Sequence, residues 1–464
     1  MPEQGHTRGQ IRPVKQAAED RLLALPGVQG VDIDHKISGG EVTDQLSIVV
    51  YVAEKKDPDK LKKAERIPAE IDGIPTDVQE EVIELQSLLV PQEQLLSGVD
   101  TGKYTPLRGG VSMGPCRGIY MEPPDVPSPG HYLTSGTLGA MVRDRSTGAR
   151  MALTNFHVAC VDDTWSVGDA MAQPSRPDGG SCPADRYGTL TRSSLSENVD
   201  GAVITLDEGV DRECRIEEIG DVQGTVAAQV GTAVRKRGRT TRLTFGQVAS
   251  TDATVTVNFG DGIGTRTLKN QIRVTPDTGQ NARFSDRGDS GSVVVDANNR
   301  VLGLLWAGAT NGSATFLNPI NHVLNELDIE LCTAGLTLQT RPVICDQLLT
   351  RAVVCTVTRP ISCQIVTRAR EVCSIVTSPT LGCRPPITLP GPACPPPRTF
   401  TQCPPQTLAC GFDHLSPRAH ATDADSPVSP FGTDPEQVVD DAFWLGYYTA
   451  LEAMGDAEAE QEGS

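Results

Sequence analysis

The alternation of apolar and polar positions predicts a chain built mainly from β-strands. Between about residues 111 and 331, short apolar runs such as GTLGAMVRD, DGAVITL and RVLGLLWAG recur between turns rich in Gly, Asp and Asn. Helical spacing is almost absent there until HVLNELDIEL, near residue 330. Many short strands separated by turns are typical of a β-sandwich or a β-barrel.

The first 95 residues predict a small α/β module. AAEDRLLALPGV has helical spacing of Leu22, Leu23 and Leu25 and ends at a Pro-Gly stop signal. VQGVDIDHKI and QLSIVVYVAEKK are typical of strands, and the charged run DPDKLKKAERI predicts a second helix. We expect His35, a lone histidine, to be structural. A polar, Gly-rich linker follows from Pro91.

The character of the chain changes after Cys332. A degenerate repeat, with threonines at 340, 350, 358, 367 and 377, fills residues 333–412 and becomes Pro-rich from Arg384. The period predicts stacked strand-and-turn units or an extended chain. Residues 413–464 are acidic and predict one amphipathic helix over VVDDAFWLGYYTALEAM, which we expect to pack on its own protein.

Composition narrows the classes of function. The 464 residues carry a formal net charge of −18, which argues against nucleic-acid binding. A basic cluster is therefore interpreted as a solvated hairpin; its members are Arg235, Lys236, Arg237, Arg239 and Arg242. No apolar run is long enough to span a membrane, and the N-terminus has no apolar signal region. We expect no membrane partner and a cytoplasmic location, with release or non-Sec export of the tail left open.

The 13 cysteines fall into two groups. Four precede residue 330, and among them Cys160 and Cys182 either form a bridge or stay as free buried thiols. The other nine, from Cys332 to Cys410, contain no C-x-x-C pair, so zinc binding is a weak interpretation. Stacked thiols or disulfides fit better. We expect no metal and no organic cofactor.

Three polar motifs stand at strand ends. LTNFHVAC contains His157, SENVDGAVITL contains Asp200, and RGDSGS contains Ser290, with separations of 43 and 90 residues. A serine nucleophile needs a histidine base, an anion that orients the base, and backbone N–H groups that stabilise the oxyanion. Asp207 and Asp211 are rival orienting groups, but they lie beyond the ITL strand, which favours Asp200.

Order and spacing of these motifs resemble those of chymotrypsin-like (trypsin-fold) serine peptidases, over roughly residues 105–332. The resemblance implies a double β-barrel and an oxyanion hole made by the backbone N–H groups of Gly288 and Ser290. GLLWAG is similar to the strand that lines the substrate pocket, which implies Trp306 and Gly308 as pocket residues and Phe284 near an apolar or shallow pocket base. The N-terminal module resembles that of bacterial trypsin-like peptidases, with plant narrow-leaf-type peptidases as distant relatives.

The resemblance has one departure. In secreted family members a new N-terminus, made by cleavage, pairs with the aspartate before the serine. That aspartate is Asp289 here, and no such activation sequence precedes Val111. Asp289 therefore pairs with a basic group instead, or the enzyme needs no cleavage.

Two hypotheses from different classes follow. The first is a serine endopeptidase that hydrolyses a protein or peptide substrate, which could include its own C-terminal tail. The alternative is a catalytically silent trypsin-fold binding or scaffold protein whose Cys-rich repeat tail carries the function.

Overall fold

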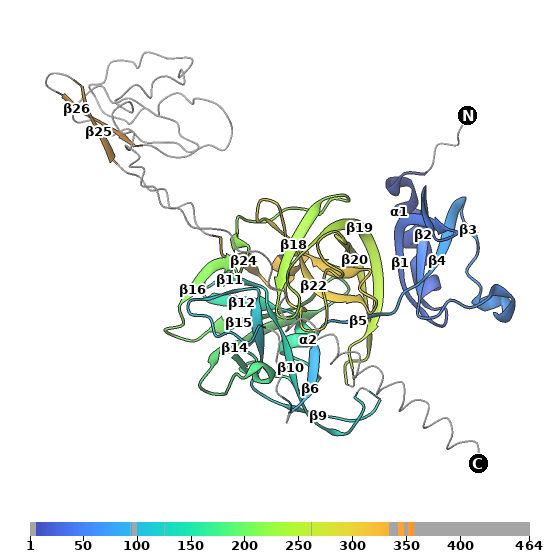
Figure 1. Cartoon of the computed structure of the whole chain (residues 1–464), viewed down its shortest axis with the longest axis horizontal. Helices are drawn as coiled ribbons and strands as arrows, with labels where there is room; N and C mark the ends of the chain where they lie inside the picture. Colours follow the sequence, from blue (N-terminus) through green and yellow to red (C-terminus); the bar gives the residue numbers. More distant parts are fainter. Residues whose placement is uncertain are drawn as a thin grey trace, which may run out of the picture. The chain divides into compact units, whose positions relative to one another are not determined.

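The computed structural model describes residues 6–92, 94, 100–124, 126–260 and 262–333, together with two strands of the tail. Its contacts divide the chain into two units, Met1–Ala334 and Gly335–Ser464. The first unit is mainly β and contains two barrels (Figure 1), which confirms the predicted fold class. In the second unit β25 (Pro342–Gln347) pairs antiparallel with β26 (Arg351–Thr356). The expectations for the rest of the tail lie outside the described residues.

The N-terminal module is one helix packed on a small sheet. Helix α1 (Arg8–Leu23) begins earlier than predicted, because Thr7 and Gln10 form a capping box. Its apolar face, with Ile11 and Leu22, packs on the sheet residues Val31 and Ile33. The sheet strands are β1 (Val28–Ser38), β2 (Glu41–Val52), β3 (Glu70–Ile71) and β4 (Ile74–Glu80).

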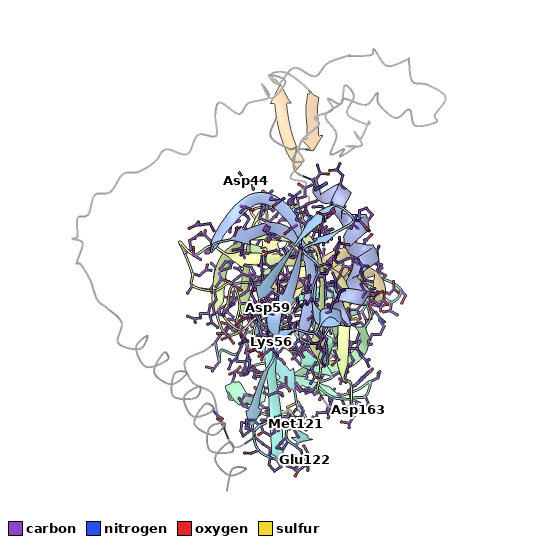
Figure 2. All side chains as sticks on the ribbon, turned by 90° about the vertical axis from the view of Figure 1, so that its right-hand side faces the viewer. Asp44, Lys56, Asp59, Met121, Glu122 and Asp163 are labelled. Atoms are coloured by element: carbon purple, nitrogen blue, oxygen red, sulfur yellow. A yellow bond between two sulfur atoms is a disulfide. The ribbon has the colours of Figure 1, made fainter. Side chains whose placement is uncertain are left out.

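Two predictions about the module have clear outcomes. The predicted second helix is wrong, because residues 57–67 form only the 3-10 turns η1 (Pro58–Lys60) and η2 (Lys63–Glu65). Lys56 and Asp59, both labelled in Figure 2, lie on this connection with exposed side chains. His35 lies in the β1–β2 hairpin, where Nδ1 is 2.9 Å from the carbonyl oxygen of Thr43.

The first barrel is a ten-stranded sheet in which β24 pairs with β11 at one end and β6 pairs with β10 at the other. Strand β10 continues into β11 past Gly139, which bends the sheet round on itself. Its strands are β6 (Leu88–Pro91), β8 (Val111–Pro115), β9 (Ile119–Met121), β10 (Gly130–Leu138), β11 (Ala140–Asp144), β12 (Arg150–Thr154), β13 (Ala170–Ala172), β14 (Arg186–Leu195), β15 (Asp200–Leu206) and β24 (Ile329–Leu331). Short helices α2 (Phe156–Ala159) and η3 (Arg176–Asp178) lie in its connections.

The second barrel closes because β18 pairs with both β19 and β21. Its long strand β19 also pairs with β1, through Gly30↔Val255 and Val31↔Thr254, so the module and this barrel share one sheet. The barrel strands are β18 (Ala233–Gly238), β19 (Arg242–Asn258), β20 (Thr265–Pro276), β21 (Val293–Asp296), β22 (Val301–Ala309) and β23 (Thr315–Pro319), with β5 (Ile83–Leu85) added to β22. Helix α3 (Ile320–Glu326) follows β23.

A three-stranded sheet of β7 (Leu107–Gly109), β16 (Arg212–Ile216) and β17 (Gly220–Asp221) completes the unit. Two disulfides correct the cysteine predictions. Cys182 bonds to Cys116, not to Cys160, which is a buried free thiol whose pKa is raised by burial to about 12. Cys332 bonds to Cys214 and therefore belongs with the barrels rather than with the tail cysteines.

Candidate active site

The three predicted catalytic residues lie next to strand ends in the two barrels. His157 lies in α2, which follows β12, and Asp200 opens β15; both belong to the first barrel. Ser290 belongs to the second barrel, in the tight turn that precedes β21. All three side chains are buried.

His157 and Asp200 are held together by two hydrogen bonds. The Nδ1 atom of His157 contacts Oδ2 of Asp200, and the His157 backbone N–H donates to Oδ1 over 3.2 Å. The Nε2 atom of His157 is buried without a hydrogen-bond partner among the described residues. Of the rival aspartates, Asp207 pairs with Arg186, and Asp211 accepts from the backbone N–H of Arg212.

Asparagine and glutamine side chains that sequence reasoning missed fix Asp200 from both barrels. Asn155 donates to the Asp200 carbonyl oxygen over 2.7 Å, and Oδ1 of Asn318 accepts the Asp200 backbone N–H over 3.1 Å. Gln271 then accepts from Asn318 at 2.8 Å and from the Trp306 indole at 2.9 Å. Asn155 stands within the histidine motif, but Asn318 and Gln271 are isolated amide residues inside β23 and β20 and belong to no sequence motif. Only the folded structure reveals their part in this network.

The turn around Ser290 requires its glycines. Gly288 has φ = 101° and Gly291 has φ = 96°, a region that favours glycine. A side chain at Gly291 would also overlap the carbonyl oxygen of Thr137. The Ser290 hydroxyl donates to the Trp306 carbonyl oxygen over 3.1 Å.

The backbone N–H groups of Gly288 and Ser290 converge on a single oxygen. Both donate to the carbonyl oxygen of Gln86, over 2.7 and 3.1 Å, while the Gln86 N–H donates to Trp306 over 3.2 Å. Gln86 lies within the 95 residues that the sequence assigned to the N-terminal module. Its part in the site was missed because the strand before it, β5, has three residues and gives no periodic signal.

A buried ion pair supports the same turn. Nζ of Lys236 lies 3.1 Å from Oδ2 of Asp289, and neither side chain is exposed to solvent. Burial alone would raise the pKa of Asp289, but Lys236, the Thr241 hydroxyl and backbone N–H groups outweigh it and lower that pKa. The basic group is thus internal, and the pair needs no new N-terminus.

The same finding corrects the prediction of a solvated basic hairpin. The hairpin exists, as β18 and β19, but Lys236, Arg237 and Arg239 are buried. Arg237 pairs with Asp100 and Glu218, and Nε of Arg239 donates to Asp178 over 2.9 Å. Buried cations paired in this way are structural rather than available to nucleic acid.

The predicted pocket residues occupy different places. Phe284 packs in the core of the second barrel, beneath Lys236. Trp306 is buried, and its carbonyl oxygen accepts from the Gln86 N–H and the Ser290 hydroxyl. A methyl group at Gly308 would overlap the side-chain amide of Gln86. Thr315 stands opposite Gly308 in the β22–β23 ladder, and its hydroxyl lies 2.6 Å from that of Ser285.

Within the described ranges no group of three His, Cys, Asp or Glu side chains could hold a metal ion. No helix in the part of the chain that the structure describes is long and apolar enough to cross a membrane.

Comparison with known proteins identifies relatives of the barrel region. No model of a known protein family matches the chain. It is 29% identical over 188 residues to serine protease 1 of Streptomyces fradiae, spanning 40% of this chain and 46% of that protein, which is less than half of the relative's length. It is 30% identical over 115 residues to glutamyl endopeptidase 2 of Streptomyces griseus, spanning 25% of this chain and 55% of that protein.

A solved structure, Thermobifida fusca protease A, aligns with 49% of this chain and 98% of its own, at 20% identity and a TM-score of 0.34. The chain is also 32% identical over 177 residues to serine protease 2 of Streptomyces fradiae, and the match spans 38% of this chain and 87% of that protein. Because nearly all of that relative is matched, the chain belongs to the trypsin-fold serine protease family that includes serine protease 2.

Proposed function

We propose that the chain hydrolyses peptide bonds through an acyl-enzyme on Ser290. The observation that carries this proposal is the pair of N–H groups, from Gly288 and Ser290, that donate to one carbonyl oxygen. Two preorganised donors aimed at the same oxygen stabilise the negative charge that develops there in the transition state.

His157 acts as the base and then as the acid. Its Nε2 atom takes the Ser290 proton as Oγ attacks the substrate carbonyl carbon, and returns it to the leaving nitrogen. Asp200 holds the Nδ1–H tautomer and stabilises the imidazolium. For this step the Ser290 hydroxyl exchanges its bond to the Trp306 carbonyl for one to Nε2, by rotation about its Cα–Cβ bond.

We infer a preference for glutamine or glutamate as the residue before the cleaved bond. Gln86 is 5% exposed, and its side-chain amide lies against Gly308, whose ladder partner Thr315 has its hydroxyl 2.6 Å from that of Ser285. The buried Oε1 atom of Gln86 has no hydrogen-bond partner among the described residues. Hydroxyl groups can donate to an amide or carboxylate oxygen, and one relative is named a glutamyl endopeptidase. Peptides that differ only in Gln, Glu, Lys or Phe at this position would measure the preference.

The first test is covalent labelling with a fluorophosphonate probe. Since the Gln86 carbonyl fills the proposed oxyanion hole, the probe is applied to the wild type and to Gln86→Pro, whose missing N–H removes the bond to Trp306. We expect Ser290 to be labelled in at least one of them, and no label on Ser290→Ala or His157→Ala. Silence in both would overturn the proposal and favour the scaffold hypothesis.

The C-terminal tail remains a proposed substrate of the same site. Cleavage between residues 333 and 340 that disappears in Ser290→Ala would support it.

A further inference from the structure

Residues 82–91 run through the proposed catalytic site as an extended strand. Before Gln86, strand β5 pairs antiparallel with β22, through Ile83↔Ala309, Glu84↔Gly308 and Leu85↔Ala307. The Val82 carbonyl oxygen also accepts the Thr310 N–H over 2.9 Å. This is the strand addition by which sheet edges bind extended peptides.

The chain passes Ser290 without a break and pairs again on the far side. Strand β6 joins β10 of the first barrel, through Leu88↔Ser135 and Val90↔Leu133 among others. The Gln92 N–H then donates to the His131 carbonyl oxygen over 2.8 Å. The segment is thus held on both sides of a single peptide bond, Gln86–Ser87.

Gln86 stands where the residue before a cleaved bond must stand. Its carbonyl oxygen accepts from Gly288 and Ser290, its N–H donates to Trp306, and its side chain occupies the space left by Gly308. Glu84 adds an ion pair with Arg287, which lies in the turn that carries Ser290, called here the catalytic turn. We propose that Ser290 cleaves the Gln86–Ser87 bond of its own chain; this inference rests on the proposed function.

The step balances as an ordinary hydrolysis. Oγ of Ser290 gives its proton to Nε2 of His157 and bonds to the Gln86 carbonyl carbon, and the oxyanion is held by the two N–H groups. The C–N bond then breaks, and the proton passes to the Ser87 nitrogen. Water hydrolyses the ester, which leaves a carboxylate on Gln86, a free amine on Ser87 and the original Ser290.

The cleaved pieces stay together. The module is bound to the second barrel by the β1–β19 ladder and by buried polar contacts. Nζ of Lys15 donates to Thr254 over 2.6 Å, and Arg273 donates to Asp34 over 2.7 Å. The product is therefore a two-piece molecule, with residues 1–86 held without a covalent bond, since every cysteine of the chain lies after residue 86.

The test is the intact mass and N-terminal sequence of the purified full chain. We expect the wild type to give residues 1–86 and a second piece that begins at Ser87. The pieces should co-elute in buffer and separate only in denaturant. Ser290→Ala should remain one chain, and it should stay intact when mixed with active wild type, because β5 and β6 hold its Gln86–Ser87 bond against its own barrels.

A matched pair of variants at Ser87 tests the bond itself. Between β5 and β6 the Ser87 backbone N–H makes no hydrogen bond to the described residues, so both variants are compatible with the fold. Ser87→Pro replaces the leaving N–H by a ring and should lower the cleaved fraction by at least about tenfold. Ser87→Ala should be cleaved like the wild type. Equal cleavage of the two variants would overturn the inference.

The remaining outcomes separate this inference from the proposed function. If the probe labels Ser290 but the wild-type chain stays whole at Gln86–Ser87, the inference is wrong and the protease function stands. If there is neither label nor cleavage, both are wrong. A cut at this bond in Ser290→Ala would assign it to another protease and overturn the inference.

Discussion

The ammonium of Lys236 lies 3.1 Å from the carboxylate of Asp289, and both side chains are fully buried next to the catalytic turn. Thr240 and Thr241 donate their backbone N–H groups to the same carboxylate, over 2.8 and 3.1 Å. The pair therefore ties strand β18 to the residue that precedes Ser290. It holds the Gly288 and Ser290 N–H groups in position from the moment the chain folds.

Lys236→Met should lower the free energy of unfolding by about 3–5 kcal/mol, because it leaves Asp289 buried and unpaired. Peptide hydrolysis should fall as well, since the turn that carries Gly288 loses its support. Urea unfolding and steady-state kinetics measure the two effects. The double variant Lys236→Met with Asp289→Asn should recover much of the stability, and a double variant as unstable as the single one would contradict this account.

Asp200→Asn should lower kcat by about 10⁴-fold with little change in KM, because an amide in place of the carboxylate favours the wrong tautomer of His157. Asp207→Asn is the matched control, since Asp207 pairs with Arg186 away from His157. The measurement is hydrolysis of a fluorogenic peptide by both variants in the Gln86→Pro background, because the Gln86 carbonyl otherwise fills the oxyanion hole. A similar loss of kcat in the two variants would mean that Asp200 does not orient His157 for catalysis.

The sequence could predict the barrels and the three polar motifs because each signal is local. A histidine after an apolar strand, an aspartate that opens a strand and a serine between glycines are all visible within ten residues. Local patterns also predicted β1 and β2. The charged run at residues 57–67 has helical composition, but Pro58 and Pro68 confine it to short turns.

Long-range pairing could not be predicted in this way. Lys236 is buried only because Asp289, 53 residues later, compensates its charge. Strands β5 and β6 are three and four residues long and pair with partners far along the chain. Cys332 directly follows the last barrel strand and stands first in the series of tail cysteines, so only its bond to the distant Cys214 assigns it to the barrels.

Gly308→Ala should lower kcat/KM for a peptide with Gln before the cleaved bond by about 10–200-fold. The physical reason is that a methyl group there would overlap the side chain that Gln86 now places in the pocket. A peptide with Ala at the same position should lose much less, because its side chain does not reach as far. Equal losses for both peptides would show that Gly308 does not set the pocket, and an unchanged unfolding midpoint would exclude a general defect.

Asp32→Asn should stabilise the protein at neutral pH, although it removes a charge from a polar cluster. Asp32 is fully buried where the module meets β19, and burial raises its pKa to about 6, against the favourable effect of Arg273. The Ser250 hydroxyl donates to it over 2.5 Å, and that hydroxyl can bond an amide equally well.

The sign of this effect follows from proton linkage. A raised carboxyl pKa means that the folded state keeps its proton between about pH 4 and pH 6, where the unfolded state has lost it. The stability of the wild type therefore falls as the pH rises through that window and stays lower above it, by roughly 3 kcal/mol at most. Asp32→Asn lacks this loss. In urea unfolding from about pH 4 to pH 8, the free energy of unfolding of the variant minus that of the wild type should therefore rise until about pH 6 and then stay constant. Asp34→Asn, which breaks the ion pair with Arg273, should destabilise at neutral pH. A variant Asp32→Asn that is less stable than the wild type at neutral pH would show that the hydrogen bonds of the ionised carboxylate outweigh the cost of burying it.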